Sequence, residues 1–315
     1  MESKICFLIP IYPPDYHYLI FLKDLTINDK FMIIFIFTYL NDFKLFENII
    51  ISKNYSTYKN ISHIILEDNH IIKPYISSFD HKDKGIINIK KIYGLYYIIT
   101  NSKYNFDYIA CVDCEIRFIN TKKVYDKFKL YCERKTAICG NTSIRQPQHF
   151  FLENIHNECL NYIKQIDIEK INNLTNNGNF YFWYSDINIY DVKLLPDFLK
   201  YISFDYSNFS NFIKRMNFFT FDYIIYYYYC MIYHDYKLLC MEHYNINRHW
   251  SMEASSFEIY DAVKNKMNYE TNIVIGNCYY KNVEKFKDNM PLFIYNLNNG
   301  RYNNIYNRNV DYLDN

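Results

Sequence analysis

The sequence predicts an α/β protein with a mixed, mainly parallel β-sheet flanked by helices. Over the first 120 residues, short apolar runs alternate with longer stretches of helical spacing, which is typical of parallel sheets. Each apolar run is continuous, as expected for strands that are buried on both faces. The four runs expected to form strands are 4–11, 31–38, 62–67 and 107–112.

Helices are expected between these strands. Residues 85–100 have helical length and apolar spacing, and residues 16–25 have a compatible spacing. Asp42 is expected to cap a short helix after the second strand.

The second half of the chain has a less regular pattern. Residues 219–236 are expected to be helical and include the run Tyr226 to Tyr229. Four consecutive side chains point in different directions around a helix, so some rings should pack in the core and others should meet solvent or a partner. The other expected elements are helices at 121–134, 149–171 and 194–201, and strands at 136–140 and 180–192.

Composition argues against several classes of protein. The chain carries 35 basic and 34 acidic residues, so no nucleic-acid partner is expected, because such binding needs a concentrated basic surface. It has only six glycines and neither a G-x-G-x-x-G nor a G-x-x-x-x-G-K-[ST] motif. The dinucleotide-binding and P-loop classes therefore lose their main sequence signal.

The sequence predicts a cytoplasmic protein without a transmembrane segment. The start of the chain lacks a signal-peptide pattern, and the apolar run FMIIFIFTYL has only ten residues, too few to cross a bilayer. Nine cysteines, an odd number, favour free thiols in a reducing compartment. The abundance of Ile, Asn, Tyr and Lys indicates an AT-rich genome; if the source is a large DNA virus, the compartment would be the host cytoplasm.

Two acidic residues follow the fourth predicted strand. Asp113 and Glu115 are separated by one residue, so both can reach one divalent cation at the strand end. Mn²⁺ or Mg²⁺ prefers oxygen ligands and keeps positions open for phosphate oxygens. Residues 10–12 and 67–68 also fall at predicted strand ends, and in parallel sheets ligands bind beyond these ends. The alternative is that the two acids are solvated loop residues.

Two segments resemble the core of GT-A-fold glycosyltransferases. They are CFLIPIYPPDY and KKIYGLYYIITNSKYNFDYIACVDCEIRFI, in which Asp113-Cys114-Glu115 stands where that family has a D-x-D motif. The resemblance covers roughly residues 4–120 and departs from the family pattern at Glu115. It implies a Rossmann-like sheet with a C-terminal acceptor subdomain. The donor contacts implied are Asp113 and Glu115 on metal and nucleotide sugar, Pro10, Ile11 and Tyr12 around the base, Asp68 on uracil or ribose, and Lys91 on sugar or phosphates.

Two further acids are candidates for the base that deprotonates the acceptor hydroxyl. Asp186 follows the aromatic segment FYFWYS, and aromatic rings beside a carboxylate suit a sugar. The alternative for Asp186 is an ordinary turn aspartate. Asp222 resembles the acid that begins the acceptor-facing helix of GT-A enzymes, and its alternative role is a helix cap or dipole partner.

The segment NINRHWSMEAS adds two candidate donor contacts. By the same resemblance, His249 would be a further metal ligand, and Arg248 could bind the diphosphate. A structural histidine is the alternative for His249.

Together these observations predict a hexosyl- or related transferase. It would move a sugar from a nucleotide diphosphate sugar, expected to be UDP-linked, to a glycan or glycoprotein acceptor with the help of Mn²⁺ or Mg²⁺. Residues 1–120 would form the nucleotide-sugar-binding half of one domain, and residues 121–315 its acceptor-binding half. The alternatives are an inactive GT-A-like carbohydrate- or protein-binding module and a metal-dependent nucleotidyltransferase. The donor sugar, acceptor, stereochemistry and oligomeric state stay open.

Overall fold

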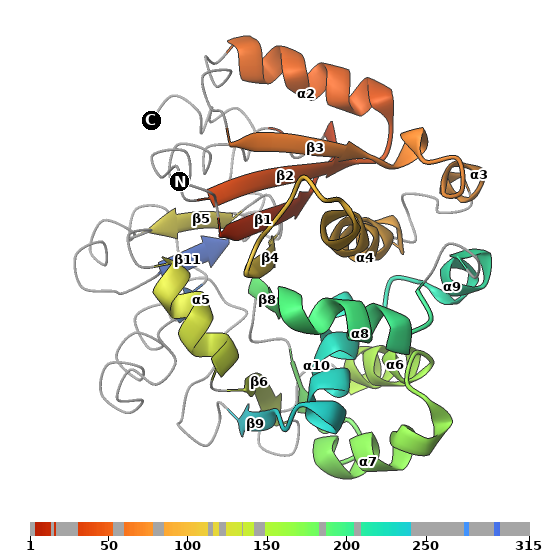
Figure 1. Cartoon of the computed structure of the whole chain (residues 1–315). Coiled ribbons are helices and arrows are strands. Elements are labelled where there is room, and N and C mark those ends of the chain that lie inside the picture. The colour runs from red at the N-terminus through yellow and green to blue at the C-terminus, as the bar shows by residue number, and fades with distance from the viewer. Residues whose placement is uncertain are drawn as a thin grey trace, which may run out of the picture.

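The main sheet has five strands in the order β3-β2-β1-β4-β8 (Figure 1). The computed structural model describes residues 4–13, 16, 31–52, 60–77, 85–112, 116–119, 124–133, 135–141, 149–182, 187–204, 209–240, 274–276 and 293–296. The strands of this sheet are β1 (Ile5–Pro10), β2 (Phe31–Phe37), β3 (Ile61–Ile65), β4 (Tyr108–Val112) and β8 (Ile187–Asp191). The predicted α/β class, with a mixed and mainly parallel sheet flanked by helices, is confirmed.

Strand pairing in this sheet is parallel except at one edge. β1 pairs in parallel with β2 and β4, and β2 pairs in parallel with β3. β8 pairs antiparallel with β4, so that Tyr108 lies opposite Asp191 and Val112 opposite Ile187. All four predicted strands of the first half are present. The third ends at Ile65 and is followed by the 3-10 turn η3 (Leu66–Asp68).

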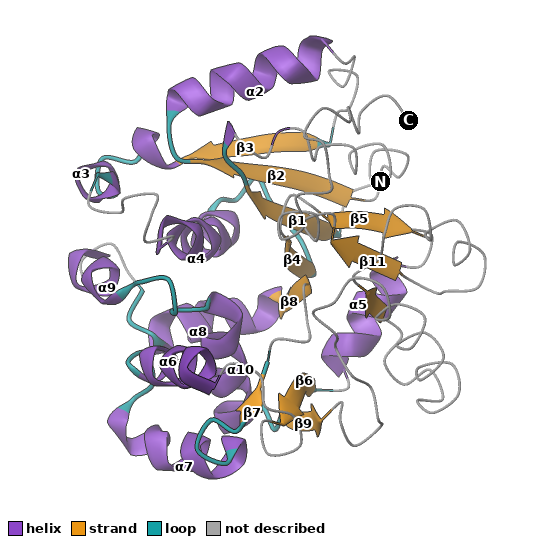
Figure 2. Cartoon of the chain, turned by 180° about the vertical axis from the view of Figure 1, so that it is seen from behind, coloured by secondary structure: helices purple, strands orange, loops and turns teal. Residues whose placement is uncertain are grey.

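Helices cover both faces of the sheet (Figure 2). On one face, the Phe7 ring contacts Phe128 of α5 (Val124–Glu133) at 5.9 Å between centroids. Phe35 contacts Phe46 of α2 (Leu40–Ser52) on this face at 4.7 Å. On the other face, alternate residues of β1 and β2 pack against α4 (Gly85–Thr100), whose bounds agree with the predicted helix.

The start of α2 differs from the prediction. The helix has 13 residues and begins at Leu40, so Asp42 lies in its first turn and is not the residue before it. The backbone N–H of Leu40 donates to Glu67 Oε2 at 3.1 Å. The carboxylate of Glu67 in η3 therefore satisfies a terminal amide of α2. The predicted capping residue was Asp42.

Helices of the second half of the chain form a layer below α4 in Figure 1. The predicted helix at 149–171 is divided by a turn into two helices, and the helix at 209–215 was not predicted. The helices of this layer are α6 (His149–Leu160), α7 (Gln165–Thr175), α8 (Leu195–Tyr201), α9 (Phe209–Arg215) and α10 (Asp222–Tyr233). Two short helical elements are also present, α3 (Lys73–Ile76) and η5 (Val192–Leu194).

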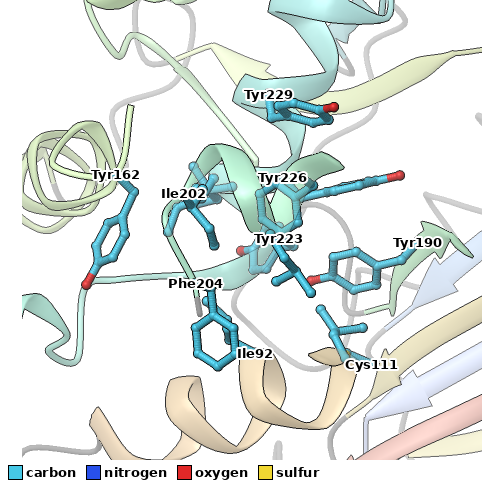
Figure 3. Close-up of a cluster of buried hydrophobic side chains, with 14 of the residues drawn as sticks. Ile92, Cys111, Tyr162, Tyr190, Ile202, Phe204, Tyr223, Tyr226 and Tyr229 are labelled. Carbon is cyan, nitrogen blue, oxygen red and sulfur yellow. The ribbon is translucent and has the colours of Figure 1, made fainter. Parts of the chain in front are cut away.

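The tyrosine run on α10 is buried on every side, contrary to the expectation that some rings would be exposed. Exposed fractions for Tyr226 to Tyr229 range from 1% to 5%. The reason is that separate elements surround the helix. Tyr226 contacts Tyr190 of β8 at 4.8 Å between centroids (Figure 3). Tyr229 contacts Tyr201 of α8 at 5.3 Å between centroids. A helix that is apolar all round is a core helix.

Two small sheets complete the described elements. The predicted strand 180–192 is two strands, β8 in the main sheet and β7 (Phe180–Tyr181) in a sheet of order β7-β6-β9. The other strands of that sheet are β6 (Thr136–Asn141), as predicted, and β9 (Lys237–Cys240). The second small sheet contains β10 (Val274–Gly276), β11 (Phe293–Asn296) and β5 (Ile116–Ile119).

The described part of the chain bears on the predictions about membrane-spanning helices and cysteines. Within that part, no helix combines the length and apolarity needed to cross a bilayer. Six cysteines of that part are buried free thiols: Cys6, Cys111, Cys132, Cys139, Cys159 and Cys230.

His156 on α6 is buried in a polar network inside the helical layer. Its Nδ1 lies 2.6 Å from the Tyr228 hydroxyl, and its Nε2 lies 3.2 Å from Asn172 Oδ1. A neutral ring with its proton on Nε2 satisfies both contacts, because it donates to Asn172 and accepts from Tyr228. Gly178 packs on this ring with φ of 82°, and a Cβ there would lie 2.8 Å from it, so glycine is required.

Acid is expected to destabilise the protein through His156. Burial lowers its pKa below 6.5, although the hydrogen bond with Asn172 acts in the opposite direction. The unfolded chain therefore takes up the proton first, and the stability from the neutral ring is lost as pH falls from about 6.5 through the folded-state pKa. The free energy of unfolding between pH 7.5 and 5.5 should fall more for the native protein than for His156→Gln. Parallel pH profiles would contradict this assignment.

Candidate functional site

The ends of β1 and β4 define the candidate site. Going outward from β1, the chain places β2 and β3 on one side and β4 on the other, so the direction of the strand order reverses between β1 and β4. In open α/β sheets, ligands bind at such a reversal, beyond the carboxyl ends of the strands. β1 ends at Pro10 and β4 at Val112, so the segments that follow these residues leave the sheet from neighbouring strands.

The segment after β1 is held by hydrogen bonds on two sides. Pro10, the last residue of β1, has no N–H to donate. The N–H of Ile11 donates to the carbonyl oxygen of Ile36 in β2 at 3.1 Å. The carbonyl oxygen of Ile11 accepts from Lys90 Nζ at 2.7 Å. Ile11 is fully buried and Tyr12 is half-buried, so this segment passes from the core to the surface at this end of the sheet.

Two adjacent lysines of α4 are buried, and one of them, Lys90, reaches the segment after β1. Lys90 is 2% exposed and Lys91 is 7% exposed, which is rare for this residue type. Lys90 was not among the predicted site residues. A signal was present, however: it lies four residues after Ile86 and four before Gly94, both of them buried on α4. That spacing places Lys90 on the buried stripe of the helix.

The segment after β3 divides into a structural acid and an exposed acid. Glu67 accepts from the N–H of Leu40 and lies 3.9 Å from Lys73 Nζ. Asp68 is exposed at the same end of the sheet. β3 is two strand positions from β1, which corresponds to roughly 10 Å between the strands. Of the two acids of η3, Asp68 is the more exposed.

Asp222 lies in the core at the first turn of α10. It has no exposed surface, and its Oδ2 accepts a hydrogen bond from the Tyr190 hydroxyl. Burial, followed by the negative charge of Asp222, raises the pKa of Tyr190 well above its ordinary value. The phenol therefore stays protonated and acts as the donor. The residue before the helix is Phe221, and no side chain caps this terminus. A catalytic role for Asp222 would require a movement that exposes its carboxylate.

The remaining predicted site residues lie outside the described residues. They are Asp113, Glu115, Asp186, Arg248 and His249. Within the described ranges, no group of three or more His, Cys, Asp or Glu side chains could hold a metal ion. The predicted Mn²⁺ or Mg²⁺ site therefore depends on Asp113 and Glu115, which directly follow β4 in the chain. Their carboxylate oxygens are of the type that these cations prefer.

Comparisons with known proteins find similarity only at the level of solved structures, and that similarity is distant. No protein-family model matches the chain, and no curated protein sequence matches it. A similar solved structure is the X-ray structure of the mannosyltransferase Ktr4p from S. cerevisiae, with 13% sequence identity and a TM-score of 0.33. The match covers 69% of this chain and 64% of the mannosyltransferase chain, which is less than two thirds of that chain. We transfer no residue role from it.

Proposed function

We propose that the chain is a glycosyltransferase that binds a UDP-linked sugar at the edge between β1 and β4. One observation carries the proposal: β1 and β4 end side by side where the strand order reverses, and the chain continues from β4 directly into Asp113-Cys114-Glu115. An acidic pair at such a position suits a divalent cation that binds a diphosphate. The cation, Mn²⁺ or Mg²⁺, would stabilise the negative charge of the leaving nucleotide diphosphate.

The described residues support this placement of the donor. The buried segment at Pro10, Ile11 and Tyr12 offers a fixed surface for the base. In the proposal, Asp68, which ends the turn after β3, two strand positions from β1, contacts the uracil or ribose. Lys91, buried on α4 next to Lys90, is our candidate for the sugar or phosphate contact. In the proposal, Arg248 binds the diphosphate and His249 is the third metal ligand.

The acceptor, a glycan or glycoprotein, is assigned to the half of the chain formed by residues 121–315. If the reaction needs a base, we favour Asp186 over Asp222. The reason is the full burial of the Asp222 carboxylate and its hydrogen bond with Tyr190, which together keep it from a substrate hydroxyl in this conformation.

The test is thermal unfolding with UDP and Mn²⁺. A ligand at 100 times its Kd adds about 2.7 kcal/mol to the free energy of unfolding, which raises Tm by several degrees. We expect this rise with UDP plus Mn²⁺ and a smaller rise when EDTA replaces the metal. Asp113→Ala should remove the metal-dependent part. Glu169→Ala, at an exposed position of α7, is the matched control and should retain it.

The outcomes separate the proposal from its alternatives. If no nucleotide diphosphate raises Tm with Mn²⁺ or Mg²⁺, the proposed function is wrong. If UDP binds but no UDP is released from a panel of UDP-sugars with glycan acceptors, the chain is a binding module. Turnover of nucleoside triphosphates would instead support a nucleotidyltransferase.

A further inference from the structure

We infer that Lys90 is a positioning residue that fixes the base-binding segment after β1. The inference rests on the proposed function, because it assigns a role within that donor site. Its basis is the bond from Lys90 Nζ to the Ile11 carbonyl oxygen at 2.7 Å, made by a side chain that is 2% exposed. A charged hydrogen bond in a buried site is stronger than a neutral one.

The bond determines the direction of a whole peptide unit. The Ile11 N–H is already held by the Ile36 carbonyl oxygen, so both backbone polar groups of Ile11 have fixed partners. The peptide that joins Ile11 to Tyr12 is planar and trans, since the chain has no cis bond in its described part. When its carbonyl points to Lys90, its N–H points the opposite way. Lys90 therefore also sets the direction in which Tyr12 leaves β1.

Lys90 and Lys91 have different tasks under this inference. Lys90 acts through the Ile11 backbone, on the part of the donor site that contacts the base. Lys91 is the proposed phosphate contact. Loss of Lys90 should therefore weaken a ligand that contains a base and leave a ligand made only of phosphates unaffected. Loss of Lys91 should weaken both.

The experiment measures the affinities of UDP and of inorganic pyrophosphate, each with Mn²⁺, by calorimetry. For Lys90→Met, which keeps the length and removes the donor, we expect UDP to bind about tenfold more weakly and pyrophosphate to bind as in the native protein. Lys91→Met should weaken both ligands. Lys170→Met is the neutral control. Lys170 lies on α7, away from the proposed donor site, and its Nζ also donates to a backbone carbonyl oxygen, that of Ile232 at 2.9 Å.

Equal losses for UDP and pyrophosphate, or no loss for either, would overturn the inference. Lys90→Gln, whose amide stops short of the ammonium position, serves as a milder variant and should give the same split. If both variants fail to fold, Lys90 is a residue of the folding core, and the positioning role is rejected.

Amide hydrogen exchange provides a readout that does not need the ligand. In Lys90→Met, the amide of Ile11, which donates to the Ile36 carbonyl oxygen in the native protein, should exchange faster while the amides of α4 keep their protection. If the native protein does not bind UDP, the proposed function fails, and this exchange result then decides alone whether Lys90 holds the segment. Unchanged exchange at Ile11 would overturn the inference.

Discussion

Replacing Asp222 with alanine is expected to lower the free energy of unfolding by about 2–4 kcal/mol. The substitution leaves the buried Tyr190 hydroxyl without the acceptor that it has in the native protein. It also removes a negative charge from the first turn of α10, where the helix dipole favours one. Urea unfolding at pH 7.5 measures the change, and the slope of free energy against urea should stay the same.

A double-mutant cycle separates the hydrogen bond from the helix effect. Tyr190→Phe removes only the donor and should cost about 1.5–3 kcal/mol, because a bond to a charged group is lost. The double variant Tyr190→Phe, Asp222→Ala should be more stable than the sum of the two single losses predicts, since both remove the same bond. Additive losses would show that the two side chains do not interact as the structure places them.

The result also bears on the role of this acid. From the sequence, Asp222 could be a helix cap, a dipole partner or a catalytic base. The structure places Phe221 at the cap position and the Asp222 carboxylate in the core, which agrees with the dipole partner. If Asp222→Asn keeps the activity of the native protein, a base at this position is excluded.

The strands and α4 were predictable because their environment leaves a strong mark on the sequence. Strands β1 and β2 are buried on both faces, so nearly every residue in them must be apolar. The helix at 85–100 has a polar residue at few positions, and its length alone separates it from a strand. The start of α2 was not predictable, because its terminal amide is satisfied by Glu67, 27 residues away.

The candidate site was predictable only in part, for a related reason. Residues 10–12 and 68 lie at or just after strand ends, as predicted, because strand ends can be recognised locally and parallel strands end at one edge. Their role in binding a ligand stays a prediction. The contact between Tyr190 and Asp222 depends on β8 pairing antiparallel with β4, and no local pattern records which strands pair. The same holds for the burial of the tyrosine run, which depends on helices and strands that surround α10 from distant parts of the chain.

Replacing Gly94 with valine is expected to lower the free energy of unfolding by about 3 kcal/mol or more. Gly94 lies in the middle of α4, where glycine costs about 1 kcal/mol relative to alanine, so its use there indicates a packing requirement. A Cβ at this position would lie 2.8 Å from Leu8 Cδ2, and would approach Ile36 Cδ1 more closely still. Both of those side chains are fully buried, so they have little room to move away.

Gly94→Ala is expected to cost less, because the gain in helix propensity offsets part of the overpacking. Asn48→Val, at an exposed position of α2, introduces the same side chain without a packing change and should alter stability by about 0.5 kcal/mol or less. Equal urea midpoints for Gly94→Val and the native protein would contradict the close packing of α4 on the sheet. Because Gly94 is one turn after Lys90, a displaced α4 should also lengthen the bond from Lys90 to Ile11. Gly94→Val should therefore weaken UDP binding more than pyrophosphate binding, as Lys90→Met does.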